Sequence, residues 1–252
     1  MTIPFHDRIV VFAGPSLPTA ARPADEIFTW LPPAIAGDAV DLVDARPRAV
    51  VLIDGLFDSI PAVRHKELLA LIAHGIPVIG GASMGALRAA ELHTLGMIGV
   101  GPIFEAFASG RLTGDDEVAV VHGPEDWDWT PLTEALVNVR ATVLRAVRQE
   151  VVGAPIGRRM VAIAAGIFYK DRTWPSLLHE LDDSNVISRA QSRILRNWLV
   201  TGAVNLKQAD AMACLDRAVR PDVLGKTRRR SPPDTIFARD LARQVRDGAR
   251  RR

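Results

Sequence analysis

The chain lacks the patterns that mark secreted, cysteine-rich and membrane-spanning proteins. Its 252 residues include one cysteine, Cys214, which excludes a disulfide framework and a cysteine zinc cluster and is typical of a reducing compartment. No apolar run approaches the roughly 20 residues that a helix needs to cross a bilayer. The first residues, MTIPFHDRIVVFAG, carry an acidic residue and do not follow the order of a signal peptide. We therefore expect a cytoplasmic protein without a membrane partner.

The chain also has little net charge, +2 at pH 7, but that charge is unevenly distributed. Residues 217–252 contain 12 Lys and Arg against 4 Asp and Glu, a balance of +8, whereas the other 216 residues contain 19 against 25, a balance of −6. A basic tail of this kind can hold an acidic protein or a nucleic acid, although most charge runs are solvated chain ends. Because no aromatic residues interleave with the arginine runs at 228–230 and 250–252, we expect no nucleic-acid partner.

The first half of the chain alternates between strand-like and helix-like patterns. Short apolar runs, each closed by Gly, Pro or Asp, predict strands at 8–13, 27–30, 48–53, 76–80 and 117–121. Helices are predicted between them at 61–72, 86–92 and 104–109. Strands that alternate with helices predict an α/β fold with a doubly wound, mostly parallel sheet of the Rossmann or flavodoxin-like kind.

The pattern changes at Pro131, after which strand signals are few. Long Ala, Leu, Val and Arg patterns predict helices at roughly 131–152, 155–170, 174–182, 188–200, 205–219 and 233–248. We therefore expect an all-helical C-terminal region that packs on the sheet or trails it. The predicted parts are an α/β core at 1–128, a helical region at 129–225 and a basic helix or tail at 226–252.

A G-x-S-x-G motif, Gly81-Ala82-Ser83-Met84-Gly85, lies between a predicted strand and a predicted helix. In this motif the glycines permit a sharp turn that raises the serine hydroxyl above the sheet, beside free N–H groups of the helix. Because a helix N-terminus favours negative charge, a serine placed there can act as a nucleophile. The alternative is that Ser83 only caps the helix.

Other polar residues follow the predicted strands and would gather at the edge where ligands bind in open α/β sheets. They are Gly14, Pro15, Ser16, Asp54, Gly55 and His122. His65 lies early in its helix and near the same edge, and Arg88 and Glu91 share one helix face at i, i+3 spacing. The group could supply a nucleophile, a base, an orienting acid and an anion clamp.

Each of these residues also has a plain structural interpretation. His65 or His122 is the candidate base, and Asp54 or Asp116 the candidate orienting acid, but a triad is recognised by geometry and not by spacing. Asp54 can form a simple Asp-Gly turn, and Arg88 and Glu91 can merely stabilise their helix.

The sequence carries no clear cofactor or metal pattern. The acidic run at 115–117 favours a turn over a magnesium site, because three adjacent acids cannot face one way along a strand. The loop at 14–16 lacks both G-x-G-x-x-G and the P-loop lysine, which makes a nucleotide-binding Rossmann-like protein an unfavoured interpretation. We expect no metal and no cofactor.

Five ordered segments of the first half resemble the TfuA-like family. They are FAGPSL (12–17), PPAIAGD (32–38), IDGLFDSIPAVRHKELL (53–69), GASMGALRAAEL (81–92) and TGDDEVAVVHGP (113–124). Residues 169–174 and 207–211 are similar to a later part of the family, less tightly.

The resemblance implies a role beside YcaO-type proteins, which are ATP-dependent enzymes that activate backbone amides in peptide thioamidation. A TfuA-like protein is expected to hydrolyse a thiocarboxylated, ubiquitin-like sulfur carrier, to supply sulfide and to assist the YcaO partner. The precursor peptide is a further expected partner.

Under this interpretation Ser83 is the nucleophile or oxyanion binder, His65 and Lys66 are the candidate base and anion partner, and Arg88 steadies the carboxylate end of the carrier tail. Asp54 is counted with the catalytic residues as the orienting acid, and the expected substrate-binding residues besides Lys66 are Gly14, Pro15, Ser16, Gly55, Glu91 and His122. The alternative is a non-catalytic adaptor that binds the YcaO partner and the precursor peptide.

Overall fold

The computed structural model describes residues 5–58 and 60–224. The chain divides into two compact units. We call the first the sheet unit, which comprises the described residues up to 113 and from 208 onward, and the second the helical unit, residues 114–207. The predicted basic tail at 226–252 lies outside the described residues, and the domain limits at 128 and 225 stay predictions.

The sheet unit contains a five-stranded sheet in which every pair of neighbouring strands is parallel. The strands are β1 (Ile9–Phe12), β2 (Phe28–Leu31), β3 (Ala49–Leu52), β4 (Val78–Gly80) and β5 (Ile98–Gly99), in the order β2-β1-β3-β4-β5. This is the flavodoxin-like order, in which the chain changes direction across the sheet between β1 and β3. The predicted α/β fold with a parallel sheet and a helical region is confirmed.

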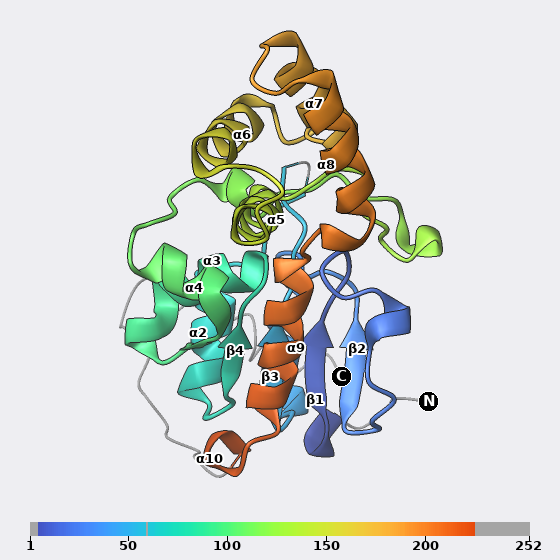
Figure 1. Ribbon diagram of the computed structural model, residues 1–252. Helices are drawn as coiled ribbons and strands as arrows, with labels where there is room; N and C mark the ends of the chain where they lie inside the picture. The colour runs from blue at the N-terminus through green and yellow to red at the C-terminus, as the bar shows by residue number, and fades with distance from the viewer. Residues whose placement is uncertain (1–4, 59, 225–252) are drawn as a thin grey trace. The chain divides into compact units, whose positions relative to one another are not determined.

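Helices cover both faces of the sheet because consecutive strand side chains point to opposite faces. Val10, Phe12 and Leu52 pack on one face against helices α1 (Leu42–Ala45), α2 (His65–Ala73) and α3 (Met84–Leu92). Val11 and Ile79 lie on the other face, which is covered by residues of α9 (Leu206–Ala218), the helix drawn in front of the strands in Figure 1. The last part of the described chain therefore completes the core of the first part.

Shorter helices fill the rest of the sheet unit. They are η1 (Phe5–Asp7), η2 (Thr19–Ala21), η3 (His93–Leu95), α4 (Gly101–Ala108) and α10 (Pro221–Leu224).

The helical unit is built from four longer helices around a core of its own. They are α5 (Leu136–Arg148), α6 (Ala154–Gly166), α7 (Trp174–Asp183) and α8 (Arg189–Gly202), preceded by η4 (Asp115–Glu117) and η5 (Glu125–Trp127). Their buried side chains, among them Leu136, Met160, Leu181 and Leu195, form one hydrophobic cluster. Among the described residues, no helix has the length and apolar character needed to cross a membrane.

Two local predictions were wrong, each for a physical reason, and one strand was missed. Residues 117–121 form no strand, because side chains replace strand partners there: Lys207 donates to the Val118 carbonyl (2.7 Å), and Thr133 accepts from the Val121 N–H (2.8 Å). Helix α2 begins at His65 and not near residue 61, because residues 61–62 pair with the loop after β2. The short strand β5 was not predicted.

Candidate active site at the carboxyl edge of the sheet

The turn between β4 and α3 is set by glycines that let backbone segments approach closely. A Cβ on Gly85 would collide with the Leu52 carbonyl of β3, and one on Gly81 would lie 2.5 Å from the Cys214 sulfur. The turn is further fixed by hydrogen bonds from the Ser83 N–H to the Gly81 carbonyl (2.8 Å) and from the Gly85 N–H to the Ile53 carbonyl (3.1 Å). The positive φ of the turn, 65°, falls on Ala82 and not on Ser83.

Ser83 occupies the N-cap position of α3, but its hydroxyl does not cap the helix. The residue is 5% exposed, and no group in the described chain forms a hydrogen bond with its Oγ. The N–H of Met84, the next residue, also lacks a carbonyl partner among the described residues. An unpaired hydroxyl beside an unpaired N–H at a helix N-terminus is the arrangement that binds a developing oxyanion.

The loop after β1 is held beside this turn by Asp54, which follows β3. The Asp54 carboxylate accepts hydrogen bonds from the Gly14 N–H (2.8 Å), the Ser16 N–H (3.0 Å) and the Ser16 hydroxyl (2.6 Å). Gly55 approaches the start of α3 so closely that a Cβ there would lie 2.8 Å from the Met84 side chain. The edge thus brings residues 14–16, 54–55 and 83–84 together, with Asp54 as the buried anchor of the loop.

His65, Arg88 and Glu91 form a second group, which links the start of α2 to α3. The Glu91 carboxylate contacts His65 Nε2 (2.6 Å) and accepts a hydrogen bond from Arg88 Nη1 (2.9 Å). Arg88 Nε also donates to the Val63 carbonyl (3.0 Å). Lys66, the second residue of α2, is half-buried. The predicted base is therefore hydrogen-bonded to a carboxylate, and neither His65 nor Arg88 forms a hydrogen bond with Ser83.

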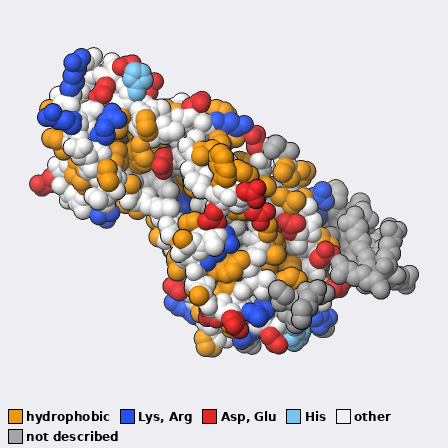
Figure 2. Space-filling model, turned by 90° about the vertical axis from the view of Figure 1, so that its right-hand side faces the viewer, with side chains coloured by type: hydrophobic (Ala, Val, Ile, Leu, Met, Phe, Trp, Pro, Cys, Tyr) orange, Lys and Arg blue, Asp and Glu red, His pale blue; other side chains and the backbone are white. Residues whose placement is uncertain are grey.

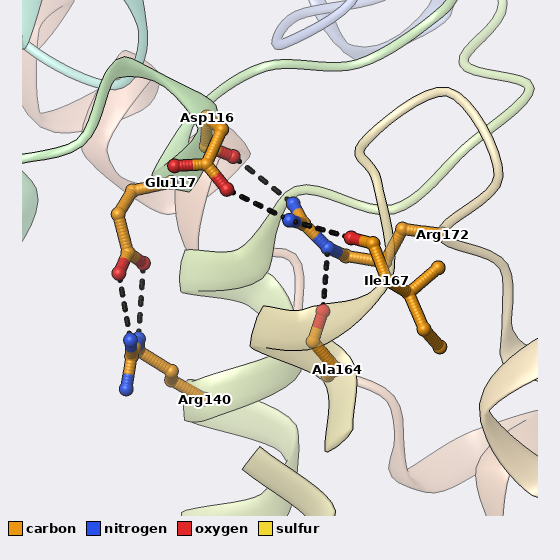
Figure 3. Close-up of polar contacts among 6 residues, drawn as sticks. All are labelled: Asp116, Glu117, Arg140, Ala164, Ile167 and Arg172. Atoms are coloured by element: carbon orange, nitrogen blue, oxygen red, sulfur yellow. Dashed lines mark hydrogen bonds and ion pairs between the residues drawn. The ribbon is translucent and has the colours of Figure 1, made fainter. Parts of the chain in front are cut away.

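The alternative base and acid, His122 and Asp116, belong to the helical unit. His122 Nδ1 lies 2.8 Å from the Gly123 carbonyl oxygen. Asp116 forms an ion pair with Arg172 (2.8 Å), while its neighbour Glu117 binds Arg140 through both carboxylate oxygens (Figure 3). In the helical unit these acids join η4 to the helices.

Glu67 and Asp210 are buried carboxylates that sequence reasoning missed. Glu67 accepts the Gly37 N–H with both oxygens (3.0 and 2.9 Å) and so anchors the loop after β2, and burial raises the pKa of its carboxyl. The available signal was a carboxylate flanked by apolar Leu68 and Leu71 on the buried side of α2.

Asp210 caps the start of α4 from α9. Its carboxylate accepts the Ile103 N–H (3.0 Å), and it lies against Gly101, which has a φ of 91°. Burial, assisted by the nearby negative charge of Glu105, raises the pKa of Asp210 from 3.8 to about 6. The residue is 2% exposed, so the folded state binds this proton more tightly than the unfolded chain does.

We expect Asp210→Asn to remove a pH dependence of stability. A raised folded-state pKa stabilises the wild type below about pH 4, and this contribution is lost as the pH rises through about 6. At 1.36 kcal/mol per pKa unit, the unfolding free energy of the wild type relative to Asp210→Asn should fall by up to about 3 kcal/mol between pH 3 and pH 7. Urea unfolding across this range tests it, with Asp216→Asn as the control for charge on the same helix. A constant difference would contradict the assignment.

Part of the chain matches the sequence model of a known protein family. Residues 54–173, slightly less than half of the chain, match the sequence model of the family described as TfuA-like protein. The match includes Ser83, His65 and Arg88, whereas the loop at 14–16 precedes it. A comparison with curated proteins finds no match for the chain.

Proposed function

We propose, on the premise that residues 54–173 match the model of the TfuA-like family, that the chain is an accessory protein of YcaO-dependent peptide thioamidation. In this proposal it works in the cytoplasm, hydrolyses a thiocarboxylated, ubiquitin-like sulfur carrier, supplies the released sulfide and assists the YcaO partner. The precursor peptide would be bound by the same assembly.

One observation carries the hydrolytic part of this proposal, namely the unpaired hydroxyl of Ser83 beside the unpaired N–H of Met84. Ser83 is largely buried as a residue, yet its Oγ is not among the fully buried, unpaired side-chain atoms of the described chain, so a substrate can reach it. Such a group at a helix N-terminus is suited to meet a reacting carbonyl, since the dipole favours the negative charge that develops on the oxygen.

The chemistry that fits this geometry is acyl transfer from sulfur to oxygen. Ser83 Oγ would attack the thiocarboxylate carbon, with the oxyanion placed against the Met84 N–H. The carbon–sulfur bond then breaks, and the departing sulfur takes the hydroxyl proton and leaves as hydrosulfide. Water hydrolyses the resulting ester, which restores Ser83 and yields the carrier carboxylate. In the second form of the proposal, Ser83 only donates a hydrogen bond to the oxyanion and water attacks directly.

This route uses the sulfur of the substrate as the proton acceptor, which matters because His65 is paired with Glu91. Arg88 and Lys66 would contribute positive charge for the anionic tail of the carrier. Residues 14–16, anchored by Asp54, would form the opposite wall of the site.

We expect Ser83→Ala to lower sulfide release from a thiocarboxylated carrier by at least about 10²-fold, the range lost when one oxyanion donor is removed. Sulfide is measured over time with purified carrier and the full chain. Ser184→Ala is the matched control, because its hydroxyl is exposed and bonds only to the Glu180 carbonyl. Thermal unfolding checks that both variants are folded. Wild-type release from a folded Ser83→Ala variant would remove the hydrolase proposal.

A non-catalytic adaptor is the second candidate function, favoured by the engagement of His65 with Glu91 instead of Ser83. An adaptor would leave carrier hydrolysis at its background rate yet still raise the thioamidation rate of the YcaO partner. Ser83→Ala would then have no effect on that stimulation. The same pair of assays therefore separates the two functions.

A further inference from the structure

Helix α8 presents one long face that is not used by the core of the helical unit. A capping box between Ser188 and Gln191 fixes the start of the helix. Leu195 and Leu199 are buried in the hydrophobic cluster, whereas the side of the helix away from them is exposed.

Three arginines lie along this exposed side at i, i+4 and i+7 spacing, namely Arg189, Arg193 and Arg196. Val200 continues the same line at i+11, and it is 84% exposed. We call these four residues the α8 stripe. At a rise of 1.5 Å per residue the stripe is about 16 Å long.

The arginines of the stripe have no ion pair in the described part of the chain, and α8 contains no acidic residue. Arg140 and Arg172 of the same unit are paired, with Glu117 and Asp116, whereas the arginines of α5 and α6 other than Arg140 are, like those of the stripe, without an ion pair among the described residues. Like charges three or four residues apart destabilise a helix by about 0.2–0.5 kcal/mol per pair. The stripe is thus an unneutralised row of charge that a negatively charged partner would stabilise.

The apolar end of the row distinguishes between classes of partner. Val200 extends the row with an aliphatic surface, and Ile194 on the flank is 56% exposed. On the helical unit in Figure 2, Lys and Arg side chains lie beside exposed hydrophobic ones. A nucleic acid would favour exposed aromatic side chains for base stacking, but the aromatic residue of α8, Trp198, is half-buried and donates to Gln149 (3.0 Å). Arginine and carboxylate form two parallel hydrogen bonds, and an acidic polypeptide can add an apolar residue for Val200.

We propose that the α8 stripe is a docking surface for an acidic polypeptide segment, whose carboxylates meet Arg189, Arg193 and Arg196 and whose apolar residue packs on Val200. The segment is about 16 Å long where it contacts the stripe, the length of three turns of helix. This surface belongs to the helical unit and does not depend on the chemistry of Ser83.

The test uses the full chain and a fluorescent 20-residue helical peptide with Glu at positions i, i+4 and i+7 and Leu at i+11. We expect the double reversal Arg193→Glu/Arg196→Glu to weaken binding of this peptide at least 10-fold, and added salt to weaken wild-type binding. The matched control is Arg158→Glu/Arg159→Glu, which reverses two exposed arginines of α6 and changes the net charge equally. It should change binding less than 2-fold.

The remaining outcomes overturn the proposal. Equal loss in the two double variants would mean that the peptide responds only to net charge. Equal binding of a peptide with Gln in place of Glu would remove the role of carboxylates, and no wild-type binding would remove the surface. Stripe-dependent binding of a 20-nucleotide RNA without peptide binding would assign the surface to the other class of partner.

Discussion

Gly85→Ala is expected to prevent the sheet unit from folding. The added Cβ would collide with the Leu52 carbonyl oxygen and would lie 2.7 Å from its carbon. Both atoms belong to the backbone of a central strand that is fully buried, so neither side can move without breaking the pairing of β3 with β1 and β4. We expect the free energy of unfolding to fall by more than about 4 kcal/mol, a size that few single substitutions reach, and we expect little soluble folded protein.

The same Gly→Ala substitution at Gly166 should stabilise the protein instead of destabilising it. Gly166 is the last residue of α6, and a Cβ there meets no atom within 4 Å. Because Ala is favoured over Gly in a helix, Gly166→Ala should stabilise the protein by a few tenths to about 1 kcal/mol. Soluble yield, circular dichroism and urea unfolding of the two variants make the comparison. A folded Gly85→Ala variant of wild-type stability would show that α3 does not need this close approach to β3.

The contrast explains why the turn around Ser83 could be predicted while other parts of the fold could not. The spacing of Gly81 and Gly85 between an apolar run and an Ala-rich segment predicts a sharp strand-to-helix turn, which is formed within a few residues, although the atoms that these glycines approach, on Leu52 and Cys214, are distant in the sequence. Strand β5, by contrast, is two residues long and contains Gly99, so its pattern carries no period. Residues 117–121 have the composition of a strand, but Lys207, far along the chain, provides the partner for Val118.

In the candidate site, too, some features could be predicted from the sequence and others could not. That residues 14–16 and 54–55 meet follows from the parallel strands that precede them, and this was predicted from position alone. Which carboxylate meets which histidine depends on side-chain geometry across two helices. The pairing of His65 with Glu91, from α2 and α3, is a contact of that kind. The roles of Ser83, His65 and Arg88 in chemistry stay predictions that the sulfide assay addresses.

Arg172→Met is expected to produce the second large effect, in the helical unit. Arg172 is 1% exposed, and its guanidinium donates to the Ala164 (2.9 Å), Ile167 (3.1 Å) and Asp116 (3.0 Å) carbonyls as well as to the Asp116 carboxylate. These bonds join the end of α6 and the residue after it to η4 (Figure 3). Methionine keeps most of the volume of the arginine side chain but leaves these carbonyl oxygens without their donor. We therefore expect the free energy of unfolding to fall by about 3–5 kcal/mol.

The loss should be local to the elements that the guanidinium joins. Hydrogen exchange followed by mass spectrometry should show faster exchange in residues 154–183, with the amides of β1, β3 and β4 unchanged. Asp116→Asn should cost at most about 1 kcal/mol, because that side chain is half-exposed and only one of the four bonds involves it. Arg145→Met, at an exposed position of α5, should change stability by less than about 0.5 kcal/mol.

These variants also bear on why residues 169–174 resemble the family, since Arg172 lies within them. If Arg172 serves the fold, Arg172→Lys should not restore stability, because an ammonium group has no planar fork to reach acceptors on both sides. Full stability of Arg172→Met or Arg172→Lys would contradict this structural role. Because the guanidinium is buried and bonds to residues of α6 and η4, we expect a loss of stability in the elements that it joins.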